Sequence, residues 1–457
     1  MTYDYLQLDK ESGVPLYEQL YRSIQEAVET GHLKKGDRLP SVRKLAEDLS
    51  LSCTTVESAY QQLCVEGYIR NEPRRGYFAQ SAQRSAPRSR TAPAETTPAP
   101  GPAVRYDFGT GSVDSDSIDL KIWRRHIRDV LNRQRVIASY GDHQGEPQLR
   151  AALSAYSYGV RGVIAPPERI IIGAGTQPLL SILCGLLGPA REVAMEEPGF
   201  AQAEQVFADC GFPVVKLPGD SDGVRMDALA NSGAKLLFVG PSNRTRTGAS
   251  IPMSRRFELL KWAEDSGGTL IEDDHNGELR YRARPIPAMQ GIGGEKSVVY
   301  IGSFSKLLLP SVRVGYMALP PALLERYLPR ARNYNQTASK IEQLALAQYI
   351  ENGQLERHLR RLRKLYSAKS SLLIQSLQES FGSGFDILLE ETALCLLLTP
   401  QFACSAEELC RLALENGVRA QTDSGGKRIR LGFSGIPLGD IPPAVACLKE
   451  TWGPVLT

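Results

Sequence analysis

The chain has 457 residues, a formal net charge of +3 and 42% hydrophobic residues. A single hydrophobic core stops growing well below this length, so we expect two or three domains. No window approaches the roughly 18 to 20 uninterrupted apolar residues of a membrane span, and the first residues lack the apolar core of a secretory signal. We therefore expect a cytoplasmic protein with no membrane partner.

Eight cysteines are scattered through the chain without a CxxC pair. Most have apolar neighbours, which is typical of reduced core thiols rather than of a disulfide framework or a zinc site. We expect no metal site.

Residues 1–80 have the pattern of a small helical unit. The segment PLYEQLYRSIQEAVETG places apolar residues four apart from Leu16 to Val28, and Gly31 can end this helix. Ser41 can cap a second helix and Ser52 a third, with a tight turn between them. The segment YIRNEPRRGYFA then predicts two short strands around a basic tip. This order predicts a winged helix-turn-helix, a unit that binds double-stranded DNA.

The charge of this unit is not basic overall, because residues 1–80 contain ten Lys and Arg against twelve Asp and Glu. The cations are concentrated at two places, however. Arg43 and Lys44 lie at the start of the second helix, and Arg74 and Arg75 lie at the tip of the predicted wing. Neutralising phosphates requires cations on one surface rather than a basic total, so this distribution favours DNA binding.

Residues 81–104 are rich in Pro, Ala, Ser, Thr and Arg and nearly lack large apolar side chains. Such a segment cannot bury a core and is predicted to be a flexible linker. After it, short β-rich runs alternate with helical stretches, which predicts a large α/β domain with a mostly parallel sheet over residues 105–325. Residues 326–457 follow as a smaller α+β domain.

Lys306 follows an apolar run in GSFSKLLLPSVRVGY, between Ser303 and Ser305 on one side and Arg313 on the other. A lysine that forms a Schiff base with pyridoxal 5′-phosphate needs donors for the phosphate, an anion near the ring nitrogen and a flat surface for the ring. The run TLIEDDHN offers three carboxylates at a strand end, and Phe200 in EEPGF offers a ring. The phosphate donors would come from GAGTQ and the region of the lysine: Gly175, Thr176, Gln177, Ser303, Ser305 and Arg313. Each fragment alone fits a structural turn, a solvated loop or, for the acidic run, a metal site; their joint presence favours the cofactor site.

The N-terminal unit resembles the winged helix-turn-helix of the GntR class of bacterial regulators through PLYEQLYRSI, HLKKGDRLPSVRKLA, LSCTTV and YQQLCVEGYI. The resemblance implies DNA contacts by Arg43, by the turn before the third helix and by the wing. We therefore assign them to these residues: Arg43, Lys44, Ser52, Thr54, Thr55, Arg74, Arg75 and Gly76. The family places an arginine where this chain has Cys53.

The rest of the chain resembles fold-type I aminotransferases, and the fusion resembles the MocR/GabR family of pyridoxal phosphate-dependent regulators. The motifs are YGDHQGEPQLR, GAGTQ, EEPGF, EDDHNGELRY, SFSK and RIRLGF. The resemblance implies that Lys306 is the Schiff-base lysine, Asp273 the partner of the ring nitrogen and Phe200 the stacking ring. It also implies that Arg430 holds the carboxylate of a substrate or effector, and that the protein is a homodimer.

Two positions depart from the aminotransferase pattern. His275 stands where the enzymes have tyrosine, and Thr245 stands where they have asparagine. Both residues would support the phenolic oxygen of the cofactor. A regulator that senses an amino acid, an amine or the cofactor is therefore one hypothesis, and a working aminotransferase with an accessory DNA-binding unit is another. A cofactor-free interaction protein is the third.

Overall fold

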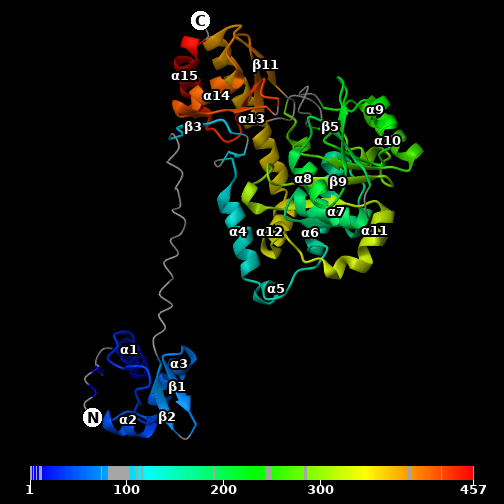
Figure 1. Cartoon of the computed structure of the whole chain (residues 1–457). Helices are drawn as coiled ribbons and strands as arrows, with labels where there is room; N and C mark the ends of the chain where they lie inside the picture. The colour runs from blue at the N-terminus through cyan, green and yellow to red at the C-terminus, as the bar shows by residue number, and fades with distance from the viewer. Residues whose placement is uncertain are drawn as a thin grey trace. The chain divides into compact units, whose positions relative to one another are not determined.

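The computed structural model describes residues 3, 5–6, 8–9, 13–73, 75–80, 103–109, 111–114, 117–188, 191–242, 250–281, 286–389, 394–423 and 425–455. They form two compact units, Met1–Gly101 and Pro102–Thr457 (Figure 1). The predicted linker lies outside the described residues except for its last two positions. The domain boundaries at 80, 104 and 325 stay predictions.

The first unit is the winged helix-turn-helix that the sequence predicts. Its helices are α1 (Leu16–Glu29), α2 (Val42–Asp48) and α3 (Cys53–Val65), and its wing pairs β1 (Ile69–Glu72) with β2 (Gly76–Ala79) in antiparallel register. Both predicted caps are present: Ser41 Oγ accepts the N–H of Lys44 at 3.3 Å, and Ser52 Oγ accepts that of Thr55 at 3.1 Å. The apolar positions of the three helices meet in one core, which contains Leu20, Ile24, Val28, Leu45, Val56, Ala59 and Leu63.

The second unit is built on a seven-stranded sheet with the order β4-β10-β9-β8-β7-β5-β6. The strands of this sheet, which lie in the predicted large α/β domain, are β4 (Ile170–Gly173), β5 (Val193–Glu197), β6 (Val214–Pro218), β7 (Leu236–Val239), β8 (Thr269–Asp273), β9 (Val298–Ser303) and β10 (Gly315–Ala318). Only β10 runs antiparallel to its neighbours; the other pairings are parallel. The expectation of a mostly parallel sheet is confirmed.

Helices cover both faces of this sheet, because successive strand residues point to opposite sides. The helices are α6 (Pro147–Arg161), α7 (Thr176–Leu187), α8 (Ala201–Asp209), α9 (Met226–Asn231), α10 (Met253–Ser266) and α11 (Pro321–Tyr327). Ile171 packs with Leu179 and Leu180 of α7, whereas Ile172 packs in the core that contains Leu149 of α6. The strands that run parallel end at one edge of the sheet, and Gly175, Asp273 and Lys306 lie at or just after the ends of β4, β8 and β9.

The C-terminal part carries a second sheet, β11-β12-β15-β14, formed by Phe385–Leu389, Cys395–Pro400, Ile429–Gly432 and Gln421–Thr422. The remaining helices are α4 (Leu120–Leu131), α5 (Gln134–Ile137), α12 (Lys340–Glu351), α13 (Gln354–Phe381), α14 (Ala406–Glu415) and α15 (Ile441–Trp452). Strand β3 (Tyr106–Asp107) pairs in parallel with β13 (Val418–Arg419). The chain that follows the linker therefore packs on this C-terminal part.

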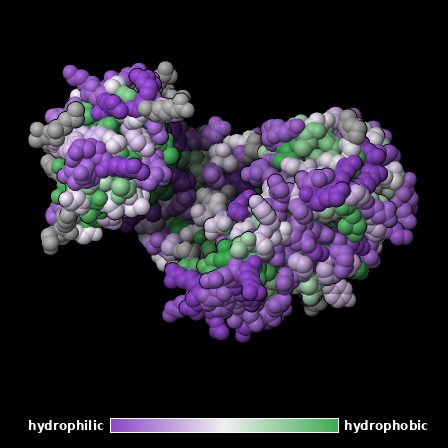
Figure 2. Space-filling view, turned by 90° about the horizontal axis from the view of Figure 1, so that it is seen from below, coloured by the Kyte–Doolittle hydropathy of each residue, from purple (hydrophilic) through white to green (hydrophobic). Residues whose placement is uncertain are grey.

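On the face shown in Figure 2, hydrophilic residues cover most of the surface and apolar residues form smaller areas between them. Within the described ranges, no helix is both long and apolar enough to cross a bilayer.

Candidate cofactor site and nucleic-acid interface

The predicted phosphate donors come together around the start of α7. Gly175 precedes this helix with φ +92°, and a Cβ atom there would lie 2.9 Å from Arg313 Nη2. Arg313 itself has left-handed backbone (φ +50°) and donates from Nη2 to the carbonyl of Ala174 at 3.1 Å. Ser303 Oγ and Ser305 Oγ are 3.3 Å apart, at the end of β9 and just after it. Helix N–H groups, a guanidinium and two hydroxyls form a cradle suited to a phosphate.

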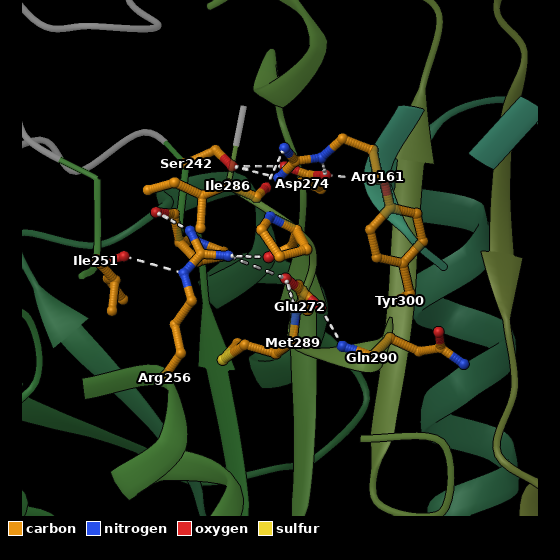
Figure 3. Close-up of polar contacts among 12 residues, drawn as sticks. Arg161, Ser242, Ile251, Arg256, Glu272, Asp274, Ile286, Met289, Gln290 and Tyr300 are labelled. Carbon is orange, nitrogen blue, oxygen red and sulfur yellow. Dashed lines mark hydrogen bonds and ion pairs between the residues drawn. The ribbon is translucent and has the colours of Figure 1, made fainter. Parts of the chain in front are cut away.

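The three carboxylates at the end of β8 have different environments. Asp274 is held by a buried network: both its oxygens accept bonds from Arg161, at 2.5 and 3.0 Å. Ser242 and Tyr300 also donate to it, at 2.7 and 2.8 Å (Figure 3). These contacts lower the pKa of Asp274 against the effect of its burial. Asp274 is thus a satisfied structural anion.

Glu272, two residues before Asp274, is also satisfied. It accepts the backbone N–H groups of Met289 and Gln290 at 2.9 and 3.0 Å, and Arg256 Nη1 lies 4.0 Å away (Figure 3). Burial and the charge of Asp274 nevertheless raise the pKa of Glu272 to about 7.

Asp273 differs from both neighbours. It is 8% exposed, and within the described part of the chain no group donates a hydrogen bond to its carboxylate. Burial, and then the charge of Asp274, raise its pKa to about 7. A buried carboxylate without a donor is unfavourable unless a cation joins it. Asp273 is therefore the member of the acidic run that is available to an external cationic group.

Lys306 follows β9, and its Nζ donates to the carbonyl of Gly111 at 2.8 Å and approaches that of Ser112 at 3.5 Å. Burial lowers the pKa of Lys306, which favours the neutral amine that nucleophilic attack requires. His275 lies close enough to respond to this lysine: burial and the charge of Lys306 lower the pKa of His275 to about 4. Its imidazole is therefore neutral near pH 7.

Arg430, in β15, faces the same region. Its Nη2 lies 3.8 Å from the sulfur of Cys395 in β12, a buried cysteine that lies close enough to Lys306 to influence the pKa of that lysine. Arg430 Nε is buried and has no partner among the described residues. Phe200 precedes α8, is 39% exposed and lies nearly parallel to Phe238, with the ring centroids 6.4 Å apart.

Several contacts at this site involve residues that the sequence patterns did not single out. Arg161 and Ser242 support Asp274, Gly111 and Ser112 contact Lys306, and Cys395 contacts Arg430. No local spacing signals these pairings, because the partners are distant in sequence and the fold alone brings them together.

In the winged unit, the hydroxyl of Ser52 lies 2.7 Å from those of both Thr54 and Thr55, so these three predicted DNA contacts form one cluster at the start of α3. Cys53 begins this helix and is exposed. Gly76, at φ +104°, begins the second strand of the wing.

The predicted DNA-contacting cations have different partners. Arg43 is exposed on α2. Lys44 pairs with Asp48 at 2.9 Å, and Arg75 pairs with Glu72 at 2.7 Å. Two predicted site residues, Arg74 and Thr245, lie outside the described residues.

Known proteins share both units. Residues 16–78 match the bacterial regulatory proteins of the gntR family, and residues 106–445 match aminotransferase class I and II. The uncharacterized HTH-type transcriptional regulator YdeL of Bacillus subtilis (strain 168) is 36% identical, over 97% of this chain and 98% of its own. The probable rhizopine catabolism regulatory protein MocR of Rhizobium meliloti is 32% identical, over 90% of this chain and 87% of its own.

A solved structure shares the fold of the second unit. The α-aminoadipate aminotransferase LysN of Thermus thermophilus, complexed with N-(5′-phosphopyridoxyl)-L-leucine, superposes with a TM-score of 0.68. The match covers 77% of this chain and 92% of the LysN chain at 23% identity, and it shows that the two chains share a fold.

These matches define a class: an HTH-type transcriptional regulator whose second unit has the fold of a class I and II aminotransferase. Within that class, the chain belongs to the MocR/GabR family. Pyridoxal 5′-phosphate is the cofactor that this membership assigns to it. The described residues fit that group in three ways: a Cβ at position 175 would obstruct the cradle, the buried carboxylate of Asp273 has no donor among them, and the pKa of Lys306 is lowered.

Proposed function

We propose that the protein is a pyridoxal phosphate-dependent regulator that binds promoter DNA and senses an amino acid, an amine or the cofactor at Lys306. The observation that carries this proposal is that the three carboxylates at the end of β8 have different hydrogen-bond partners. Arg161 satisfies Asp274 and backbone N–H groups satisfy Glu272, whereas no described residue donates a hydrogen bond to Asp273, which would bind a protonated ring nitrogen. A purely structural acidic cluster would give Asp273 a protein partner as well.

The bound cofactor would supply an aldehyde that forms Schiff bases with primary amines. The chain's own residues would hold it: the cradle with Gly175 and Arg313 would bind the phosphate, and Asp273 would keep the ring nitrogen protonated. Phe200 would stack on the ring. Arg430, whose Nε has no partner within the described residues, would bind the carboxylate of the effector.

Neutral His275 supports the sensing role. An uncharged imidazole near Lys306 can exchange hydrogen bonds with a phenolic oxygen but supplies no tyrosine hydroxyl. We infer that this change, with Thr245, favours binding over turnover. The second candidate function is an active aminotransferase with an accessory DNA-binding unit, which the presence of Lys306, Asp273 and Arg430 supports.

Regulation would follow from differential binding. We expect a cytoplasmic homodimer. An effector bound at Lys306 would change the positions of its paired DNA-binding units relative to two promoter half-sites. A coupling free energy of about 1 to 3 kcal/mol would change DNA affinity roughly 5- to 150-fold.

The test combines two measurements on the full-length protein. Titration with a panel of amines and amino acids should shift the cofactor absorption band for the effector class. Borohydride reduction should link the cofactor covalently to the parent protein, and Lys306→Ala should abolish this adduct. Lys340→Ala, which removes a lysine bonded to Ser139 Oγ, is the matched control and should leave the band unchanged. A gel-shift assay at fixed salt should show promoter binding. Repeated turnover of an amino acid with a keto acid would contradict the sensing role, and loss of promoter binding would contradict the regulator.

A further inference from the structure

The segment Gly111–Asp114 lies a few residues after the linker and runs along the C-terminal part of the second unit. Just before it, Phe108 accepts the N–H of Gly432 at 2.7 Å through its carbonyl and donates to the carbonyl of Arg419. A Cβ at Gly435 would lie 2.6 Å from Ser112 Cβ. The segment is thus packed closely against the strand that carries Arg430 and the turn that follows it.

The same segment touches the candidate cofactor lysine. Lys306 Nζ lies 2.8 Å from the carbonyl oxygen of Gly111 and 3.5 Å from that of Ser112. A lysine amine has two hydrogens to donate when neutral and three when protonated, whereas a nitrogen in a carbon–nitrogen double bond has at most one. Lys306 cannot keep both contacts once its nitrogen has entered such a bond, so its chemical state bears directly on this segment.

A buried ion pair fixes the end of the segment at Asp114. Lys369 of α13 is fully buried, and its Nζ lies 2.5 Å from Asp114 Oδ2 and 3.3 Å from the carbonyl of Ser434. Ser434 Oγ in turn donates to the carbonyl of Ser112 at 2.6 Å. Asp114 Oδ1 accepts the N–H of Ser117 at 3.0 Å. A buried ion pair adds little net stability but penalises every arrangement that separates its charges.

We propose that Asp114 is a positioning residue of the cofactor site: through Lys369 it holds the carbonyls of Gly111 and Ser112 against Lys306. The segment then transmits the state of Lys306 to the chain that leads back to the DNA-binding unit. The positioning role concerns only the second unit. The transmission to DNA rests on the proposed function.

The first test is hydrogen exchange on the full-length protein with pyridoxal 5′-phosphate as the probe. The double variant Asp114→Asn with Lys369→Met removes both charges together and retains an oxygen that can accept the Ser117 N–H. In the parent, loading with the cofactor should accelerate exchange in peptides spanning 103–118 by about tenfold, as expected for losing one or two hydrogen bonds. In the double variant, exchange there should already be fast, and loading should no longer change it.

Ser370→Ala is the matched control. Ser370 is the buried neighbour of Lys369 on α13, and its hydroxyl donates within the helix to the carbonyl of Ser367 at 3.0 Å. This variant should keep the cofactor-dependent change. Exchange of each of the three proteins is measured at a cofactor concentration that its absorption spectrum shows to be saturating. An unchanged exchange rate in the parent, or a cofactor-dependent change that survives in the double variant, would overturn the inference.

A gel-shift assay then separates the two proposals. If the cofactor changes promoter affinity in the parent, the ratio of affinities with and without it should approach one in the double variant. A ratio that persists would overturn the transmission step. If exchange responds to the cofactor but the parent binds no promoter DNA, the positioning role stands and the regulator fails.

Discussion

Replacing Asp273 by asparagine tests whether this residue serves a ligand or the fold. Burial and the adjacent charge of Asp274 raise its pKa from 3.8 to about 7 in the folded chain. A carboxylic acid whose pKa is higher in the folded state than in the unfolded state contributes stability at pH values below its unfolded-state pKa. This contribution is lost as the pH rises through the folded-state pKa. In cofactor-free protein at pH 8, Asp273→Asn should therefore increase the free energy of unfolding.

The size of the effect follows from the pKa difference. About three pKa units correspond to about 4 kcal/mol once the folded-state group is ionised, at ~1.4 kcal/mol per unit. At pH 5 the unfolded-state carboxylate is already ionised while the folded one is protonated, and the penalty is about 2 kcal/mol. The gain from Asp273→Asn should thus grow by about 2 kcal/mol between pH 5 and pH 8.

Urea unfolding followed by tryptophan fluorescence measures this gain. The three tryptophans, Trp123, Trp262 and Trp452, all belong to the second unit, so the signal reports on that unit alone. The control is Asp274→Asn, which leaves Arg161 buried without its counter-charge and should cost about 3 to 5 kcal/mol.

The two substitutions should also differ with cofactor. Asp273→Asn should weaken the binding of pyridoxal 5′-phosphate while it stabilises the cofactor-free protein. Destabilisation by Asp273→Asn at pH 8, or a pH dependence equal to that of the parent, would refute the reasoning.

Three further substitutions test the other parts of the chain. Ser52→Ala removes the N-cap of α3 and should destabilise the winged unit by about 1 kcal/mol, seen as faster hydrogen exchange of the α3 amides; equal exchange would contradict it. Arg43→Gln should weaken binding to promoter and unrelated DNA alike and reduce the salt slope by about 1, whereas a loss confined to the promoter would indicate base readout. Gly175 has φ +92°, and the added methyl group of Gly175→Ala would meet the side chain of Arg313. This variant should weaken the binding of pyridoxal phosphate more than that of pyridoxal. Equal losses for the two ligands would place Gly175 outside the phosphate site.

Much of the fold could be predicted because its signals are local. The caps at Ser41 and Ser52 depend on a side chain and an N–H group three residues away, and both are present. The seven strands of the main sheet follow from short apolar runs between turns. The order of those strands, and the antiparallel direction of β10, depend on pairings between distant segments that no local pattern specifies.

The sequence by itself determined which chemistries are available: a lysine after an apolar strand, three carboxylates at another strand end and a glycine turn before a helix. It could not distinguish the three carboxylates from one another, because they are chemically alike and adjacent in sequence, and their surroundings in the fold are what differ. Only the tertiary structure supplied Arg161 to Asp274, 113 positions away, and left Asp273 without a donor among the described residues. Likewise, only the fold brought Gly111 to Lys306 across 195 positions. Burial and hydrogen bonding act over a few ångströms in space, and the path of the whole chain decides which residues lie within that distance.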